Sequence, residues 1–167
     1  MLVSMGKRVN ILGVGVHATS LPEAVEAVLA ARTRGERGYI CVTSVHGVME
    51  SQRDETLRAI HNQSRMTVPD GMPTVWMGQE YGFIRMGRVY GPDLMLELCR
   101  KTAEPLKSLN VEGVQNEEAV RSNAGSRPLT HFLYGSTDDT LRKLKANLER
   151  RFPGVKIVGS YAPPFRP

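Results

Sequence analysis

The stretch Thr67-Val-Pro-Asp-Gly-Met-Pro-Thr-Val-Trp76 places a lone carboxylate, Asp70, in a turn between a predicted strand and a predicted helix. The apolar run Met66–Val68 stops at Pro69 and Gly71, which are typical turn residues. In an α/β sheet such a turn lies at the carboxyl edge of a strand, where ligands usually bind. An aspartate there can act as a general base, but Asp-Gly is also an ordinary turn pair.

Strands and helices alternate along the rest of the chain. The predicted strands span residues 8–16, 39–43, 66–68, 130–135 and 155–161. The predicted helices span residues 20–31, 46–52, 55–63, 73–81, 92–103 and 137–152. Such alternation is typical of parallel strands that are joined by right-handed helical crossovers. The sequence therefore predicts an α/β fold with a Rossmann-like, mostly parallel sheet and helices on both faces.

Residues 105–128 interrupt this alternation. They are polar, contain Pro, Ser, Asn and Gly, and show weak periodicity. The segment is long for an ordered connection in a compact domain, and we interpret it as an insertion or mobile loop. The chain then ends on a strand and a short tail, residues 162–167, without the helix that should follow. We expect residues 1–167 to form a single α/β domain that lacks its C-terminal part.

The composition is that of an ordinary globular protein. Hydrophobic residues make up 41% and no apolar run approaches the roughly 20 residues that span a bilayer, so we expect a cytoplasmic protein. The net charge of +5 suits an anionic nucleotide-sugar, an anionic membrane surface or nucleic acid. Scattered basic residues without interleaved aromatics disfavour nucleic acid. Cys41 and Cys99 form no CxxC pair, and we predict that both thiols are buried.

Seven short motifs occur in an order that resembles the WecG/TagA/CpsF family of bacterial glycosyltransferases. They are Ile11-Leu-Gly13, Tyr39-Ile-Cys-Val-Thr43, His46-Gly-Val-Met49, Pro69-Asp-Gly-Met72, Arg88-Val-Tyr-Gly-Pro-Asp-Leu94, His131-Phe-Leu-Tyr-Gly135 and Phe152-Pro-Gly-Val-Lys-Ile-Val-Gly159. The resemblance covers nearly the whole chain. It implies a hexosyltransferase that moves an amino sugar from a UDP-sugar to a polyprenyl-diphosphate-linked sugar, in cell-wall or exopolysaccharide biosynthesis.

The same resemblance implies a location at the inner face of the plasma membrane. Family members contact the membrane through a C-terminal part that is absent from this sequence. The resemblance implies neither a metal site nor another cofactor. We read Asp138-Asp139 as helix capping rather than as a metal-binding pair. An unfinished sheet edge also favours self-association, so we keep a homo-oligomer open.

The resemblance also implies roles for individual residues. Asp70 would be the general base of an inverting transfer. Thr43, His46 and Arg88 would bind substrate, and Arg88 has the guanidinium that can hold a diphosphate. The turn Gly135-Ser136 joins a strand to a helix N-terminus, a geometry suited to a sugar nucleotide. The chain has Val45 where family members commonly have asparagine, which puts acceptor binding in question.

Two other interpretations stay open. A truncated homologue could fold and bind a ligand or a partner chain without catalysing transfer, and Val45 favours that interpretation. The sequence Gly13-Val-Gly-Val-His-Ala18 also fits the G-x-G-x-x-A pattern of dinucleotide-binding folds. The acid that should follow the second strand is absent there, because Thr43 takes that place, so we disfavour NAD binding.

Overall fold

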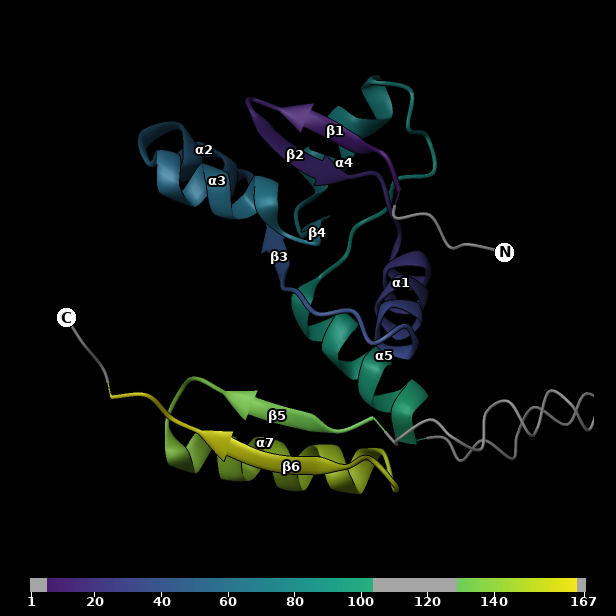
Figure 1. Ribbon diagram of the computed structural model, residues 1–167, viewed down its shortest axis with the longest axis vertical. Helices are drawn as coiled ribbons and strands as arrows, with labels where there is room; N and C mark the ends of the chain where they lie inside the picture. Colours follow the sequence, from purple (N-terminus) through teal and green to yellow (C-terminus); the bar gives the residue numbers. More distant parts are fainter. Residues whose placement is uncertain (1–5, 104–128, 165–167) are drawn as a thin grey trace, which may run out of the picture. The chain divides into compact units, whose positions relative to one another are not determined.

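The computed structural model describes residues 6–103 and 129–164, which belong to two compact units (Figure 1). Unit 1 ends at Met95, and unit 2 begins at Leu96 within the same helix. The described residues have a mixed α/β architecture, with six helices and six short strands. The predicted insertion at 105–128 lies outside the described residues. None of the helices in the described ranges is long and apolar enough to cross a membrane.

The predicted elements are nearly all present, with ends that differ by a few residues. The strands are β1 (Arg8–Ile11), β2 (Val14–His17), β3 (Ile40–Thr43), β4 (Met66–Pro69), β5 (His131–Tyr134) and β6 (Ile157–Tyr161). The helices are α1 (Leu21–Thr33), α2 (Val45–Arg53), α3 (Glu55–Gln63), α4 (Met72–Glu80), α5 (Gly91–Ala103) and α7 (Asp138–Arg151). Helix α1 begins with the expected capping contact, in which the Glu23 carboxylate accepts a hydrogen bond from the Ser20 N–H at 3.0 Å.

The prediction of one strand over Arg8–Val16 is wrong, because this segment is a β-hairpin. Strands β1 and β2 pair antiparallel around a two-residue turn. Both turn residues, Leu12 and Gly13, have positive φ angles of 50° and 83°, as the tight turns that match strand twist require. The Asn10 side chain accepts a hydrogen bond from the Gly13 N–H at 2.7 Å and closes the turn. Leucine seldom occupies such a position, so the sequence signal for the turn is weak.

Two of the three strand pairs are parallel, as predicted. Strand β3 pairs with β4 so that Thr43 lies opposite Pro69, and β5 pairs with β6. The other edge of β4 faces β2, where the Thr67 N–H donates to Nδ1 of His17 at 3.1 Å. Each sheet among the described residues has two strands. The β3–β4 pair is the part of the fold that positions the candidate site.

The core of unit 1 is built on the inner side of the hairpin. It consists of Val9, Ile11, Val14, Val16, Val48 and Met86. Met86 reaches this core because α4 has a glycine, Gly78, at the point of contact. A Cβ atom at position 78 would overlap the Met86 sulfur. The apolar hairpin is thereby packed against α2 and against the loop that follows α4.

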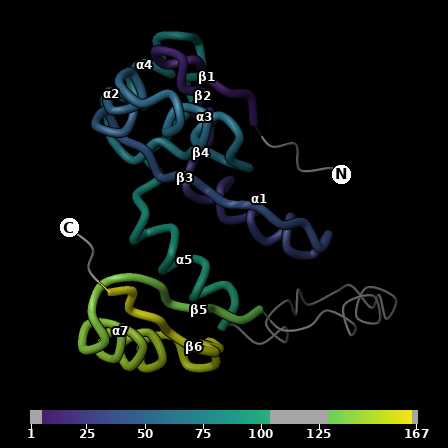
Figure 2. Tube along the Cα trace, turned by 60° about the vertical axis from the view of Figure 1, so that its left-hand side comes forward, coloured from purple at the N-terminus to yellow at the C-terminus, as the bar shows by residue number. Residues whose placement is uncertain are grey.

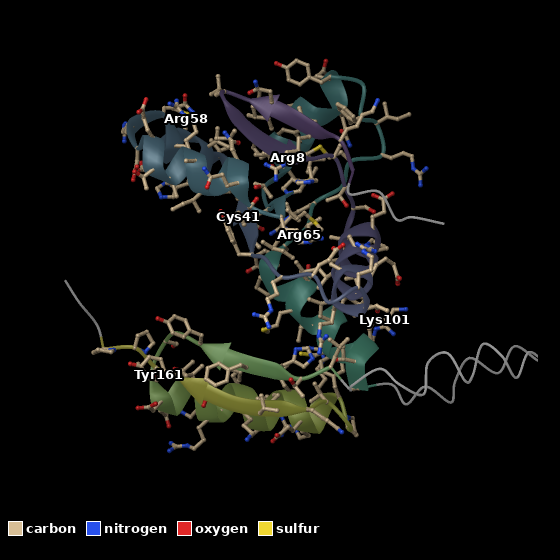
Figure 3. All side chains as sticks on the ribbon, viewed as in Figure 1. Arg8, Cys41, Arg58, Arg65, Lys101 and Tyr161 are labelled. Atoms are coloured by element: carbon tan, nitrogen blue, oxygen red, sulfur yellow. The ribbon has the colours of Figure 1, made fainter. Side chains whose placement is uncertain are left out.

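In unit 2, helix α7 runs along one face of the β5–β6 pair (Figures 1 and 2). The buried residues on this side are Leu133, Leu141, Leu148, Val155 and Ile157. The sequence spacing predicts an apolar stripe of Leu141, Leu144 and Leu148 on this helix, and the structure buries Leu141 and Leu148 but leaves Leu144 partly exposed. The rings of Tyr134 and Tyr161 lie 5.9 Å apart at the carboxyl ends of the two strands, and both side chains are exposed. Figure 3 labels Tyr161 at the end of β6.

Candidate functional site

The carboxyl ends of β3 and β4 form one edge, from which two helices start. Helix α2 begins after Ser44 and helix α4 after Gly71. The loops are adjacent, since a Cβ atom on Gly71 would lie 3.6 Å from that of Ser44. Helix α5 begins at Gly91, where an added Cβ would lie 3.5 Å from the Val42 side chain. The N–H groups of helix N-termini attract anions, so this edge is electrostatically suited to a phosphate group.

Asp70 is the carboxylate of this edge, and its side chain is 28% exposed. The Asp70 N–H donates to the Thr43 carbonyl at 2.8 Å and continues the β3–β4 ladder. Its Oδ1 atom is buried and accepts no hydrogen bond from any of the described residues. Buried polar atoms nearly always have a hydrogen-bond partner, so this oxygen keeps an unused capacity to accept a hydrogen bond. The rest of the side chain is partly exposed at this edge.

Thr43 supplies a second polar atom that is buried and makes no hydrogen bond with the described residues. The residue is 2% exposed, and its Oγ1 atom has no hydrogen-bond partner within residues 6–103 and 129–164. This hydroxyl points at the first turn of α2, where Gly47 leaves room for it. A Cβ atom at position 47 would collide with Oγ1 of Thr43. The glycine therefore holds open the space around a buried hydroxyl that can both donate and accept a hydrogen bond.

Arg88 is fixed beside Asp70 by two contacts. Its Nε donates to the Asp70 carbonyl at 2.7 Å, and its Cζ lies 4.5 Å from the centre of the Tyr90 ring. Its Nη2 atom is 3.9 Å from Oδ1 of Asp70. The buried Val89 anchors this segment, because its N–H donates to the Pro69 carbonyl at 2.7 Å. The guanidinium stays half exposed, in a position to bind an anion at this edge.

The structure therefore brings three of the predicted site residues, Thr43, Asp70 and Arg88, to one edge. His46 lies on the same edge, with an exposed side chain in the first turn of α2. Val45, which replaces the asparagine expected from the resemblance, is exposed beside it.

Gly135 and Ser136 belong to unit 2, where they form the turn between β5 and α7. Their φ angles are 116° and 56°, and the Gly135 N–H donates to the Tyr161 carbonyl at 3.0 Å. Thr137 caps α7 by accepting from the Thr140 N–H. Asp139 lies in the first turn of α7 and pairs with Arg142 and Lys143, as expected for a carboxylate that stabilises a helix start.

The comparison with known families decides the class of this protein. The family model described as "Glycosyl transferase WecG/TagA/CpsF family" matches residues 9–117 and residues 104–167. The chain belongs to this family. Membership implies glycosyltransferase activity, which acts on a sugar donor and an acceptor in polysaccharide or cell-wall biosynthesis. No curated protein matches the chain.

Two residues at the edge of this WecG/TagA/CpsF glycosyltransferase were missed by the sequence reasoning. Gly47 carries a weak signal, because glycine is a poor residue for the interior of a helix and implies a close contact. For Tyr90, the one sequence signal is its spacing of two residues from Arg88. In an extended segment this spacing places both side chains on the same side. Gly47 contacts Thr43 and Tyr90 contacts Arg88, and the motifs had already identified Thr43 and Arg88 as candidates.

A partly buried polar cluster lies near the amino end of β4, at the opposite end of that strand from the candidate site. The pKa of His17 is lowered to about 4 by burial and by the positive charge of Arg8. Arg8 also donates to the carbonyls of His61 and Ser64 at the end of α3. Figure 3 labels Arg8 and Cys41 in this unit. Burial raises the pKa of Cys41, although this thiol is only half-buried and the prediction of full burial is confirmed for Cys99 alone.

Proposed function

We propose that this glycosyltransferase moves an amino sugar from a UDP-sugar to a polyprenyl-diphosphate-linked sugar, with inversion at the anomeric carbon. The reaction would take place at the inner face of the plasma membrane, in cell-wall or exopolysaccharide assembly. The observation that carries the proposal is the unpartnered Oδ1 of Asp70, beside the unpartnered hydroxyl of Thr43 and the guanidinium of Arg88. We also propose that the parallel strand pairs belong to a Rossmann-like fold.

Asp70 acts as the general base in this proposal. The acceptor hydroxyl oxygen attacks the anomeric carbon and forms the new glycosidic bond. Its proton passes to the Asp70 carboxylate, and the bond from the anomeric carbon to the diphosphate breaks. UDP leaves with that electron pair. The carboxylate suits this role because its side chain is partly exposed at the edge and one of its oxygens makes no hydrogen bond with the described residues.

The other residues of the edge hold the substrates. Arg88 and the N-termini of α2 and α4 stabilise the negative charge that develops on the departing diphosphate. The Thr43 hydroxyl and the His46 imidazole bind sugar hydroxyl groups. Each of these residues binds or orients, whereas only Asp70 exchanges a proton with the reacting hydroxyl.

The Asp70→Asn variant tests the base assignment, because it keeps the shape and removes the basic oxygen. We expect acceptor-dependent UDP release to fall by about 100-fold or more, the usual contribution of a general base. Binding of the UDP-sugar, measured by calorimetry, should change little. Asp93→Asn is the matched control, since Asp93 lies in the first turn of α5 and should leave release intact. Near-normal transfer by Asp70→Asn would show that the role is wrong.

The exposed Val45 favours a second candidate function, that of a homologue which binds ligand without transfer. This candidate predicts UDP-sugar binding with no UDP release at any acceptor concentration. Release that depends on added acceptor would exclude it. A Val45→Asn variant sharpens the comparison, because a rise in release with that variant would identify acceptor binding as the step that valine weakens.

A further inference from the structure

A buried histidine links helices α2 and α3, which lie side by side in unit 1 (Figure 1). His61 on α3 is 6% exposed, and its Nδ1 atom lies 3.1 Å from the hydroxyl oxygen of Ser51, which is fully buried on α2. The Ser51 hydroxyl donates its one hydrogen to the Gly47 carbonyl at 2.8 Å. Nδ1 of His61 must therefore carry a hydrogen and donate it to Ser51. These two hydrogen bonds connect α3 to the first turn of α2.

Gly47 is also the point where these hydrogen bonds meet the candidate site. A Cβ atom at position 47 would lie 3.6 Å from Cε1 of His61 and would collide with Oγ1 of Thr43. The imidazole ring and the Thr43 hydroxyl, which has no hydrogen-bond partner in the described ranges, therefore lie against the same glycine. Glycine has more backbone freedom than any other residue, so this turn depends on the contacts that hold it from outside.

The position of His61 is fixed on its other side by hydrogen bonds to its backbone. Its carbonyl accepts from the hydroxyl groups of Ser64 and Thr67, at 2.7 Å and 2.8 Å. Thr67 is fully buried and belongs to β4, so these bonds attach the end of α3 to that strand. Asp70 follows the same strand, and the support of His61 and the candidate base therefore share one element.

We propose that His61 is a positioning residue for sugar transfer, which acts through Ser51 and Gly47 to hold the first turn of α2. The inference rests on the proposed function, in which the N-terminus of α2 contacts the diphosphate of the sugar nucleotide. Backbone N–H groups bind a diphosphate well only when their directions are fixed, and a displaced turn weakens this contact. His61 touches neither substrate nor the reacting atoms, so its effect reaches them only through α2.

Two substitutions break this link at different residues. His61→Leu keeps an apolar side chain of similar size without a donor, and Ser51→Ala removes the hydroxyl. Calorimetry on the full 167-residue chain measures the affinity for UDP, the part that all UDP-sugars share. Each variant should bind UDP about fivefold more weakly, as the loss of one neutral hydrogen bond implies. The double variant should lose no more affinity than either single variant, because both substitutions break the same link.

Two further variants separate positioning from a general loss of stability. His61→Asn is the conservative variant, because an amide nitrogen can replace Nδ1 as the donor to Ser51, and it should restore most of the affinity. His17→Asn is the matched control, because it replaces another buried histidine near the opposite end of β4 and should leave UDP affinity unchanged. Circular dichroism verifies that each variant is folded. Ser51→Ala is a small change within a helix and keeps the test decisive if His61→Leu does not fold.

Hydrogen exchange provides a readout that needs no ligand. Peptides that cover α2 should exchange faster in His61→Leu and in Ser51→Ala, and near the normal rate in His61→Asn, because the link no longer holds the first turn in the first two variants. Unchanged exchange in both of those variants would overturn the inference by itself.

Three binding results would also overturn the inference. They are unchanged UDP affinity in both His61→Leu and Ser51→Ala, an equal loss of affinity in His17→Asn, and losses that add in the double variant. Absence of UDP binding by the unmodified chain would instead count against the proposed function. Hydrogen exchange would then still decide whether His61 holds the first turn of α2.

Discussion

A single methyl group at position 47 would collide with Oγ1 of Thr43. Alanine stabilises a helix relative to glycine by about 1 kcal/mol, and the collision opposes this with a cost of about 1–3 kcal/mol. We therefore expect Gly47→Ala to change stability by no more than about 2 kcal/mol, while displacement of the hydroxyl lowers UDP-sugar affinity about tenfold. Calorimetry and thermal unfolding measure the two quantities.

Gly87→Ala is the control for this prediction. An added Cβ at position 87 meets Ser20 at an ordinary distance of 3.6 Å, so affinity should stay as in the unmodified chain. Unchanged affinity with Gly47→Ala would show that the Thr43 hydroxyl does not bind the donor.

The sequence singled out candidate residues with charged or reactive side chains, but not the neighbours that position them. Asp70 stood out through its place at the end of a strand and through its motif, although Asp-Gly is also an ordinary turn pair. Arg88 stood out through its motif. Gly47 matters only because the Thr43 side chain turns toward α2, and Tyr90 matters only because the Arg88 guanidinium lies over its ring. Both contacts depend on side-chain rotamers, which local sequence patterns do not specify.

At the scale of elements, the link between β2 and β4 depends on an imidazole that stays neutral. The Thr67 N–H donates to Nδ1 of His17, which must therefore be unprotonated. The folded-state pKa is about 4, below the ordinary value of 6.5. The unfolded chain thus binds the proton more readily, and the contribution of His17 to stability is present above pH 6.5 and is lost as the pH falls toward 4. Its size is about 3 kcal/mol.

Urea unfolding at several pH values, followed by Trp76 emission, measures this loss. The His17→Asn variant is the reference, because the Asn oxygen can accept the Thr67 hydrogen bond without titrating. The difference in unfolding free energy between the two proteins should shrink between pH 6.5 and pH 4. A constant difference across this range would contradict the assignment to His17.

The hairpin at β1 and β2 shows which elements the sequence leaves undecided. Strand β4 was predicted because Pro69 and Gly71 end it, and α1 because Ser20 and Glu23 cap it. The turn at Leu12 carries no such signal, because leucine seldom has a positive φ angle. The apolar residues on both sides of it therefore resembled one long strand. Packing of Val9 and Ile11 in the same core as Val14 and Val16 offsets this unfavourable turn.

At the scale of the whole molecule, alternation of elements predicted the mixed α/β class and parallel strand pairs, but not which strands pair. Strand pairing is decided by contacts between residues far apart in the sequence. The Phe132 ring covers Gly159, and a Cβ there would overlap it, so glycine sets how β6 lies against β5. Periodicity indicates which face of a strand is buried, but it does not indicate which other strand it pairs with. The family match covers residues on both sides of the segment outside the described ranges.

The packing of the Met86 sulfur against Gly78 makes this methionine a reporter of how often unit 1 opens. Met86 is 3% exposed, so peroxide can reach its sulfur only when the core separates, whereas Met72 and Met77 are exposed in the same chain. Peptide mass spectrometry should find that Met86 is oxidised about 100-fold or more slowly than Met72 and Met77. This ratio follows if opening of the core around Met86 costs a few kcal/mol. Comparable rates would mean that the core around Gly78 is loosely packed. A sulfoxide is polar and larger than the thioether, so an oxidised Met86 cannot pack against Gly78 again. Oxidation would therefore gradually increase the fraction of molecules in which the core of unit 1 does not re-form.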